Sequence, residues 1–173
     1  MALVVLLKGV NVGGYRTFRP SALARKLRRL GVVNVGAAGT FVVRKAISRT
    51  RLRAALRQRL PFDAHIMICD GHDILRLASE DPFAGHACGR DVVRFVSVMA
   101  RRRPLLSSLP RNLPAAGRWC VRVLAQQNRF VVGLYRREMR TISCLQHLET
   151  VFGAPMTTRN WNTIQMIARV LEA

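Results

Sequence analysis

The sequence predicts an α+β fold, because short apolar segments typical of strands alternate with amphipathic segments typical of helices. Hydrophobic residues make up 50% of the 173-residue chain and charged residues 22%, a balance typical of globular rather than disordered proteins. Glycine or proline separates many of these segments, where turns are expected. A chain of this length can bury a sizeable core in one domain or in two smaller halves.

The first half of the chain contains predicted elements in the order strand, helix, strand, strand, helix, strand. The first helix begins near Pro20 and ends at Gly31, and the second begins after Ser48 or Thr50 and ends before Pro61. The predicted strands are 3–7, 32–37, 40–44 and 64–69, followed by a short helix over 72–79 that Asp70 would cap. This order is that of the ferredoxin-like fold, in which two helices cover one face of an antiparallel sheet.

The second half repeats this order in a looser form. Strands are predicted over 92–99, 119–125 and 130–136, with a short helical piece over 103–109 and a loop over 110–117. A helix over 141–152 should turn Ile142, Leu145 and Leu148 toward the core and end at Gly153, and a short edge strand over 154–157 precedes a last helix capped by Thr158. We therefore predict two diverged ferredoxin-like repeats, 1–84 and 85–173, joined through Glu80–Gly85.

The net charge points to an anionic partner. Lysine and arginine number 29 against 9 acidic residues, which gives a formal charge of +20. Such a surface attracts nucleic acid, anionic membranes or acidic proteins. A G+C-rich genome also produces arginine-rich chains, and a solvated charged face is the structural alternative. Because the strands offer few aromatic side chains, stacking of bases on an open sheet is not expected.

The basic residues gather on the two predicted helices of the first half, which are neighbours in the ferredoxin-like fold. A helical face of this kind would contact phosphates without reading bases. The leading hypothesis is a non-enzymatic protein that binds phosphate-rich ligands, nucleic acid foremost. The residues of this predicted face are Arg25, Lys26, Arg28, Arg29, Arg49, Arg53 and Arg57.

A glycine-rich turn, Leu7–Gly14, follows the first strand. Its glycines can adopt positive φ, and its backbone N–H groups together with Lys8 could bind an anion. The spacing matches neither the phosphate-loop pattern nor the dinucleotide-binding pattern. A turn that merely packs is the structural alternative.

A second polar stretch, Thr157–Thr163, precedes the last helix. Thr157 or Thr158 would cap that helix, and the polar residues after them would offer donors at its N-terminus. If the first strand and the last helix meet, the two stretches would form one site for an anionic ligand, in an enzyme or a small-molecule binder. The alternative is a structural contact. The residues of this predicted ligand site are Lys8, Asn11, Gly13, Gly14, Arg159, Asn160 and Asn162.

Other catalytic or metal-binding patterns are not found, and no cofactor is predicted. The histidines lack metal-ligand spacing, no serine or cysteine lies in a nucleophile motif, and the cysteines form no C-x-x-C pair. The acidic residues near one connection are expected to cap or to face solvent rather than to act as an acid–base pair. With no secretory signal and no membrane span, we expect a cytoplasmic protein with free thiols. Whether the protein has any catalytic activity, and its oligomeric state, are not predicted.

The two polar stretches together resemble one known family. Leu-Lys-Gly-Val-Asn-Val-Gly-Gly at the start and Thr-Thr-Arg-Asn-Trp-Asn-Thr near the end are similar to those of a bacterial family known as domain of unknown function 1697. The resemblance implies a fold of two ferredoxin-like repeats and no established reaction. Members commonly carry Gln-Ser-Gly-Asn where this chain has Ala37-Ala38-Gly39-Thr40, and arginine where it has Lys8. A polar site at that hairpin would be reduced here, and lysine lacks the bidentate fork of arginine.

Overall fold

The computed structural model describes residues 1–14 and 16–173. These residues form two antiparallel sheets and five α-helices, which confirms the α+β class. The chain divides into two compact units: unit 1 contains Met1–Glu80 and Asn162–Ala173, and unit 2 contains Asp81–Trp161. The predicted boundary after residue 84 lies close to this division, but the C-terminal helix belongs with unit 1 rather than with the second half. None of the helices in the described residues is long and apolar enough to cross a lipid bilayer.

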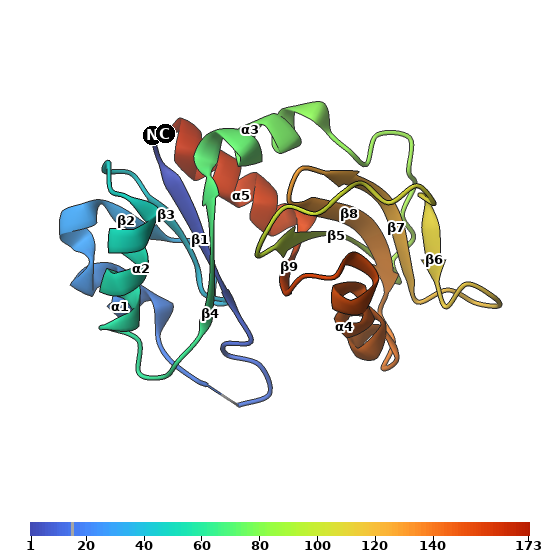
Figure 1. Ribbon diagram of the computed structural model, residues 1–173, viewed down its shortest axis with the longest axis horizontal. Coiled ribbons are helices and arrows are strands. Elements are labelled where there is room, and N and C mark those ends of the chain that lie inside the picture. Colours follow the sequence, from blue (N-terminus) through green and yellow to red (C-terminus); the bar gives the residue numbers. More distant parts are fainter. Residues whose placement is uncertain (15) are drawn as a thin grey trace. The chain divides into compact units, whose positions relative to one another are not determined.

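Unit 1 contains a four-stranded antiparallel sheet (Figure 1). Its strands lie in the order β2-β3-β1-β4, with Val5 of the central β1 opposite Phe41 on one side and Ile68 on the other. The strands are β1 (Leu3–Lys8), β2 (Val32–Asn34), β3 (Thr40–Val43) and β4 (His65–Asp70). All five residues Leu3 to Leu7 are buried. Both faces of β1 are therefore covered, as its continuous apolar run predicts.

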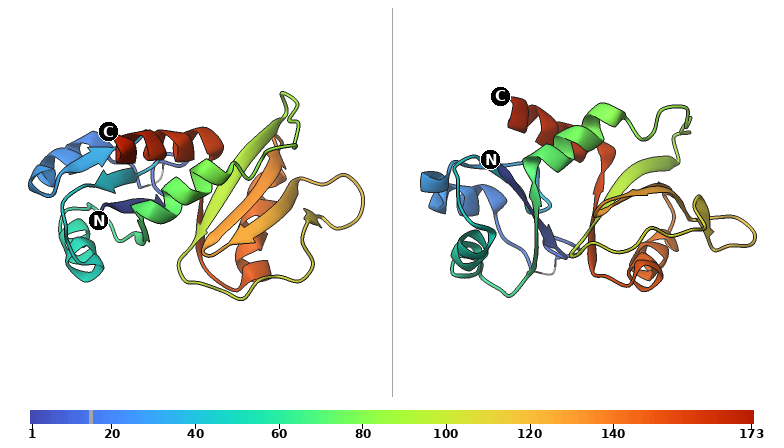
Figure 2. Two further views of the ribbon diagram at one scale, coloured as in Figure 1. Left: turned by 90° about the horizontal axis from the view of Figure 1, so that it is seen from above. Right: turned by 45° about the horizontal axis from the view of Figure 1, so that its top comes forward.

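Helices cover the two faces of this sheet. Leu3, Val5 and Leu7 pack in one core with leucines of α1 and α2, whereas Val4 and Leu6 lie on the opposite face. Figures 1 and 2 place α5 on that opposite face. The helices of unit 1 are α1 (Pro20–Lys26), the short 3-10 helix η1 (Arg28–Leu30), α2 (Arg49–Arg57), α3 (Gly71–Glu80) and α5 (Trp161–Glu172), whose first residue is counted with unit 2.

Local signals fix the ends of the first two helices. Pro20 occupies the first turn of α1, and Gly31 ends η1 with φ of 64°. Ser48 caps α2, since its Oγ accepts a hydrogen bond from the backbone N–H of Arg51 at 3.3 Å. The predicted starts of both helices are confirmed, whereas the first α-helix ends at Lys26 and the rest of its predicted length is the 3-10 helix η1. Asp70, by contrast, is the last residue of β4, and it pairs with Arg49.

Unit 2 contains a five-stranded antiparallel sheet in the order β6-β7-β8-β5-β9. Helix α4 covers one face, where Leu148 and Phe152 pack against Phe95, Val123 and Val131 of the sheet. The elements of unit 2 are β5 (Val92–Met99), β6 (Arg111–Leu113), β7 (Val121–Gln127), β8 (Phe130–Arg136), α4 (Thr141–Phe152) and β9 (Met156–Asn160). The predicted bounds of β5, β8 and α4 are the observed ones.

Three predictions for residues 103–152 of unit 2 are wrong. No helix forms over 103–109, because the side chain of Gln126 bonds to the carbonyl oxygens of Arg103 and Pro104 and to the N–H of Leu106. Part of the predicted loop over 110–117 is strand β6. Ile142 is 64% exposed, since Thr141 occupies the buried position of the first turn of α4.

Candidate functional site

Helices α1, η1 and α2 form a strongly basic surface on unit 1. Each buries its leucines: Leu23 and Leu27 on one side and Leu52 and Leu56 on the other are at most 3% exposed. No aspartate or glutamate precedes Asp63 in the sequence, so these helices supply no negative charge of their own. The exposed basic residues of the three helices and of the turn after α2 are Arg25, Lys26, Arg28, Arg29, Arg49, Arg51, Arg57 and Arg59. We call these eight residues the basic surface.

A groove with a cavity of about 500 Å³ crosses the basic surface between η1 and α2. Lys26 and Arg29 line it from one side, and Arg51 and Arg59 line it from the other. A neighbouring hollow of about 350 Å³ shares Lys26 and Arg29 with it. The apolar residues that complete the groove are Leu27, Leu30, Ala46, Ile47 and Ala55. The groove thus combines cations from α1, η1, α2 and the turn after α2 with an apolar lining.

Some basic side chains of these helices form a hydrogen bond or an ion pair within unit 1, and others do not. Arg49 Nη2 lies 2.6 Å from Asp70 Oδ2, and Arg53 Nη1 donates to the carbonyl oxygen of Ile66 at 2.6 Å. Six others make no side-chain hydrogen bond or ion pair with any residue that the structure describes: Arg25, Lys26, Arg28, Arg29, Arg51 and Arg57. Arg49 and Arg53 of the predicted face thus take part in holding unit 1 together, and the other six cations are available to a ligand.

Unit 2 is also rich in arginine, but most of these side chains are used within the unit. Arg103 Nε donates to the carbonyl oxygen of Phe152 at 3.1 Å, and Arg129 Nε donates to that of Met99 at 2.9 Å. The guanidinium groups of Arg122 and Arg136 lie 4.6 and 4.1 Å from the ring centre of Trp119. Arginines with these roles stabilise unit 2 and offer fewer donors to a partner.

The opening glycine-rich turn is held against the first hairpin of unit 1. Asn11 Oδ1 accepts a hydrogen bond from Phe18 N at 2.9 Å, and Asn11 Nδ2 donates to the carbonyl oxygen of Ala37 at 2.9 Å. Gly39 has φ of 72°, and a Cβ atom there would lie 2.7 Å from Val10 Cγ2. The amide of Asn11 therefore connects the turn to its own unit, which favours the structural alternative for this residue.

The other predicted ligand-site residues of the turn are Lys8, Gly13 and Gly14. Lys8 ends β1 and is partly buried. Gly13 and Gly14 are exposed and have φ of 56° and 76°, so the positive φ expected of them is observed. The sequence does not indicate the contact between the turn and the hairpin at Ala37, because the two are separated along the chain.

The closing polar stretch does not begin a helix, contrary to prediction. Thr157, Thr158, Arg159 and Asn160 belong to strand β9, and α5 starts only at Trp161. Thr158 bonds to Ser97 of β5 through their hydroxyl groups at 2.6 Å, so it stabilises the sheet instead of capping a helix. Polar side chains that pair across a sheet can form a strand despite their preference for turns.

Arg159 is buried at 7% exposure, and burial lowers its pKa to about 10, so it remains charged at neutral pH. Its Nη1 donates to Thr157 Oγ1 at 2.8 Å and to the carbonyl oxygen of Thr158 at 2.9 Å. Asn160 in unit 2 and Asn162 in unit 1 are exposed. The ligand site shared with Lys8 and Asn11 would lie across the two units and stays a prediction.

The described residues contain no cluster of three or more histidine, cysteine or acidic side chains that could hold a metal ion. Cys120 is fully buried, and burial together with a hydrogen bond to the carboxylate of Glu138 raises the pKa of its thiol to about 11. The same hydrogen bond, with one from Arg140, holds the pKa of Glu138 below its ordinary value. A thiol with so high a pKa is a poor nucleophile at neutral pH.

A family model described as "Protein of unknown function (DUF1697)" matches residues 1–110. The chain belongs to this family. The match contains the opening turn and the hairpin at Ala37–Thr40, which lie together in unit 1, whereas the closing stretch Thr157–Thr163 lies outside it. Membership thus supports the resemblance drawn from the opening motif and brings no reaction with it.

A solved structure agrees with the fold along the whole chain. The conserved bacterial protein SP0830 from Streptococcus pneumoniae superimposes with a TM-score of 0.57 at 14% sequence identity, over 99% of this chain and 98% of that chain. At this identity the likeness concerns the fold alone. No curated protein matches the sequence.

Proposed function

We propose that this protein is a non-enzymatic binding protein for phosphate-rich polymers, and that nucleic acid lies along the groove between η1 and α2. The observation that carries this proposal is the groove itself. Lys26, Arg29 and Arg51 line it, and none of the three makes a side-chain hydrogen bond or ion pair with another described residue. Cations that no protein group holds are the ones that can exchange their counter-ions for phosphates.

The same geometry supports binding without sequence preference. Arginine and lysine side chains on helices reach phosphate oxygens, and such contacts position a nucleic acid without reading its bases. The apolar residues Leu30, Ile47 and Ala55 in the groove offer no hydrogen-bonding group to a base edge. We therefore expect duplexes of different sequence to bind equally well, with an affinity that decreases steeply as salt increases.

The experiment is a fluorescence anisotropy titration of a labelled DNA duplex with the full chain at several salt concentrations. The test variant carries Lys26→Gln, Arg29→Gln and Arg51→Gln. The control carries Arg90→Gln, Arg102→Gln and Arg137→Gln, three exposed arginines of unit 2 whose side chains also make no hydrogen bond or ion pair with the described residues. Both variants lose three positive charges, so total charge is matched.

If the groove holds the duplex, the test variant loses up to three phosphate contacts. The slope of log affinity against log salt should then decrease by about 2.7, at about 0.9 per contact, while the control slope changes little. Equal losses in the two variants would show that net charge alone attracts the duplex. Absence of binding by the unmodified chain at low salt would exclude nucleic acid as the partner.

We further propose that the chain contains two diverged ferredoxin-like repeats, residues 1–84 and 85–173, whose sheets are those of unit 1 and unit 2. The order β2-β3-β1-β4 in unit 1 matches the order β7-β8-β5-β9 in unit 2 when strands are numbered within each unit. Strand β6 is then an extra strand at one edge of the unit 2 sheet. The segment between β5 and β7 stands where the ferredoxin-like fold has its first helix. A comparison of further solved members, strand by strand, tests this equivalence.

A further inference from the structure

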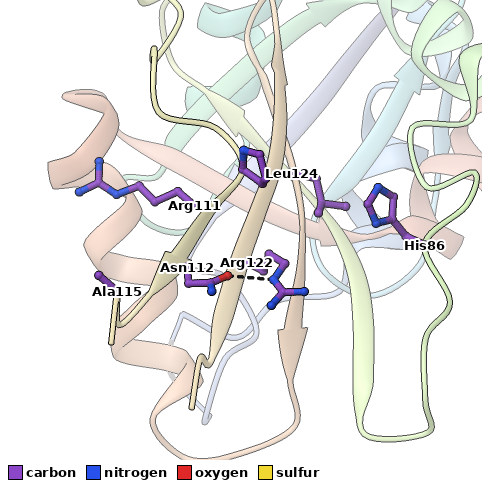
Figure 3. Close-up of a pocket in the computed structure, with 7 residues that line it drawn as sticks. His86, Arg111, Asn112, Ala115, Arg122 and Leu124 are labelled. Atoms are coloured by element: carbon purple, nitrogen blue, oxygen red, sulfur yellow. Dashed lines mark hydrogen bonds between the residues drawn. The ribbon is translucent and has the colours of Figure 1, made fainter. Parts of the chain in front are cut away.

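Unit 2 has a cavity of its own, whose lining residues are all different from those of the basic surface of unit 1. It has a volume of about 450 Å³ and lies at the β6–β7 edge of the five-stranded sheet (Figure 3). His86 lines it from the segment that precedes β5, and Pro110, Asn112, Arg122 and Leu124 line it from β6, β7 and the residue before β6. Its volume is within the range of sites that hold small molecules.

Two side chains in this cavity form a fixed set of hydrogen-bond donors. Arg122 Nε donates to Asn112 Oδ1 at 2.8 Å, and the Arg122 guanidinium lies 4.6 Å from the ring centre of Trp119. These contacts hold the guanidinium in place while leaving its two Nη groups and Asn112 Nδ2 without hydrogen-bond partners among the residues described. Figure 3 shows the two side chains next to each other. Donors held in this way need little reordering when they bind a ligand.

The lining determines the class of ligand. No carboxylate lines the cavity, and the fork of an arginine matches the oxygen atoms of a phosphate group. Leu124 and Pro110 offer apolar surface beside the donors. Arg111 also lines the cavity, but its side chain extends away from Arg122 in Figure 3. A ligand that satisfies this lining carries one phosphate on a small organic body.

We infer that unit 2 binds a small phosphate monoester, with the phosphate on Arg122 and Asn112 and the organic body against Leu124 and Pro110. This site is separate from the groove between η1 and α2, and it takes a small molecule instead of a polymer. Binding requires no covalent step. The side chain of Arg111 also contributes to the wall of the cavity.

Tryptophan fluorescence gives a readout specific to this site. The chain has two tryptophans, Trp119 and Trp161, and both belong to unit 2. A phosphate on Arg122 changes the surroundings of the Trp119 ring on which that guanidinium is stacked. The titration uses the full chain with phenyl phosphate, glycerol phosphate and adenosine monophosphate. Phenol, glycerol and adenosine test the organic part of each ligand without its phosphate, and inorganic phosphate tests the phosphate alone.

Three variants test the donors. Asn112→Asp keeps an oxygen acceptor for Arg122 Nε but places a negative charge beside the phosphate, and Arg122→Gln removes the fork. Both should weaken binding about tenfold to a hundredfold. Arg102→Gln removes the same charge as Arg122→Gln from an exposed side chain of unit 2 that does not line the cavity, and it should keep the affinity within about twofold.

The outcomes separate this site from the proposed function. The variant of Lys26, Arg29 and Arg51 should titrate like the unmodified chain, whatever its affinity for a duplex. No fluorescence change with any of the three monoesters at millimolar concentration overturns the inference. Unchanged binding by Asn112→Asp overturns it as well, as does a loss in Arg102→Gln equal to that in Arg122→Gln. If inorganic phosphate binds as tightly as the monoesters, the organic body makes no contact and the ligand class is wrong.

Discussion

Asn11→Ala tests whether the opening turn is a structural connection. The substitution removes the acceptor of the Phe18 N–H and the donor to the carbonyl oxygen of Ala37, both at 2.9 Å. Loss of the partner of a partly buried N–H costs about 1–3 kcal/mol. Asn11 also has φ of 55°, a conformation that costs alanine roughly 1 kcal/mol more than asparagine or glycine. The free energy of unfolding of unit 1 should therefore decrease by about 2–4 kcal/mol.

The measurement must report on unit 1. Because Trp119 and Trp161 both belong to unit 2, tryptophan fluorescence would miss the effect. Native-state hydrogen exchange, resolved to peptides within 1–44, measures the loss of protection directly. Asn11→Gly serves as the matched control, since it loses the same two hydrogen bonds without the cost of positive φ. It should be more stable than Asn11→Ala by about 1 kcal/mol. A change below about 0.5 kcal/mol in Asn11→Ala would refute a structural role.

Three further predictions concern other parts of the chain. Gly133→Ala places a Cβ 2.5 Å from a backbone carbonyl oxygen and 2.8 Å from the Phe95 ring, so unit 2 should lose about 1–3 kcal/mol in urea melts followed by tryptophan fluorescence. Ser48→Ala removes the cap of α2 and should cost about 1 kcal/mol, measured by exchange of peptides over 48–58, with Ser48→Asp as the variant that restores stability. The Cys120 thiol has its pKa raised from 9.0 to about 11 in the folded state, so above pH 9 the unfolded chain loses this proton first. The contribution of this thiol to stability is complete below pH 9 and lost as pH rises toward 11, and Cys120→Ala should show a shallower decline.

Much of the fold follows from signals close together in the sequence. Strand β5 is a run of β-branched and aromatic residues, and α4 ends at Gly153, whose φ of 64° is the conformation that glycine accepts at a helix end. Such elements have the predicted bounds because their stability depends on neighbours in sequence. Strand β9 does not: its threonines can cap a helix or form a strand, and pairing with β5 decides between the two.

The candidate site shows the same division. The spacing of Leu23 and Leu27 against Arg25 and Lys26 predicts a basic helical face, which the exposure of these cations agrees with. The groove depends on the distance between α2 and η1, which no short stretch of sequence determines. Likewise, the sequence does not reveal that Arg53 is held by a carbonyl oxygen while other arginines of the same helix are not.

The return of the last helix to unit 1 has a consequence for biosynthesis. Val4 and Leu6 lie on one face of the unit 1 sheet, and residues 162–173 belong to the same unit. In the chain, the whole of unit 2 separates residues 162–173 from the strands of this sheet. A ribosome therefore makes the whole of unit 2 before it makes the segment that covers this face. Unit 2 is complete first and can fold first, although it comes second in sequence. Until residues 162–173 emerge, nascent unit 1 lacks the segment that completes the cover of this apolar sheet face.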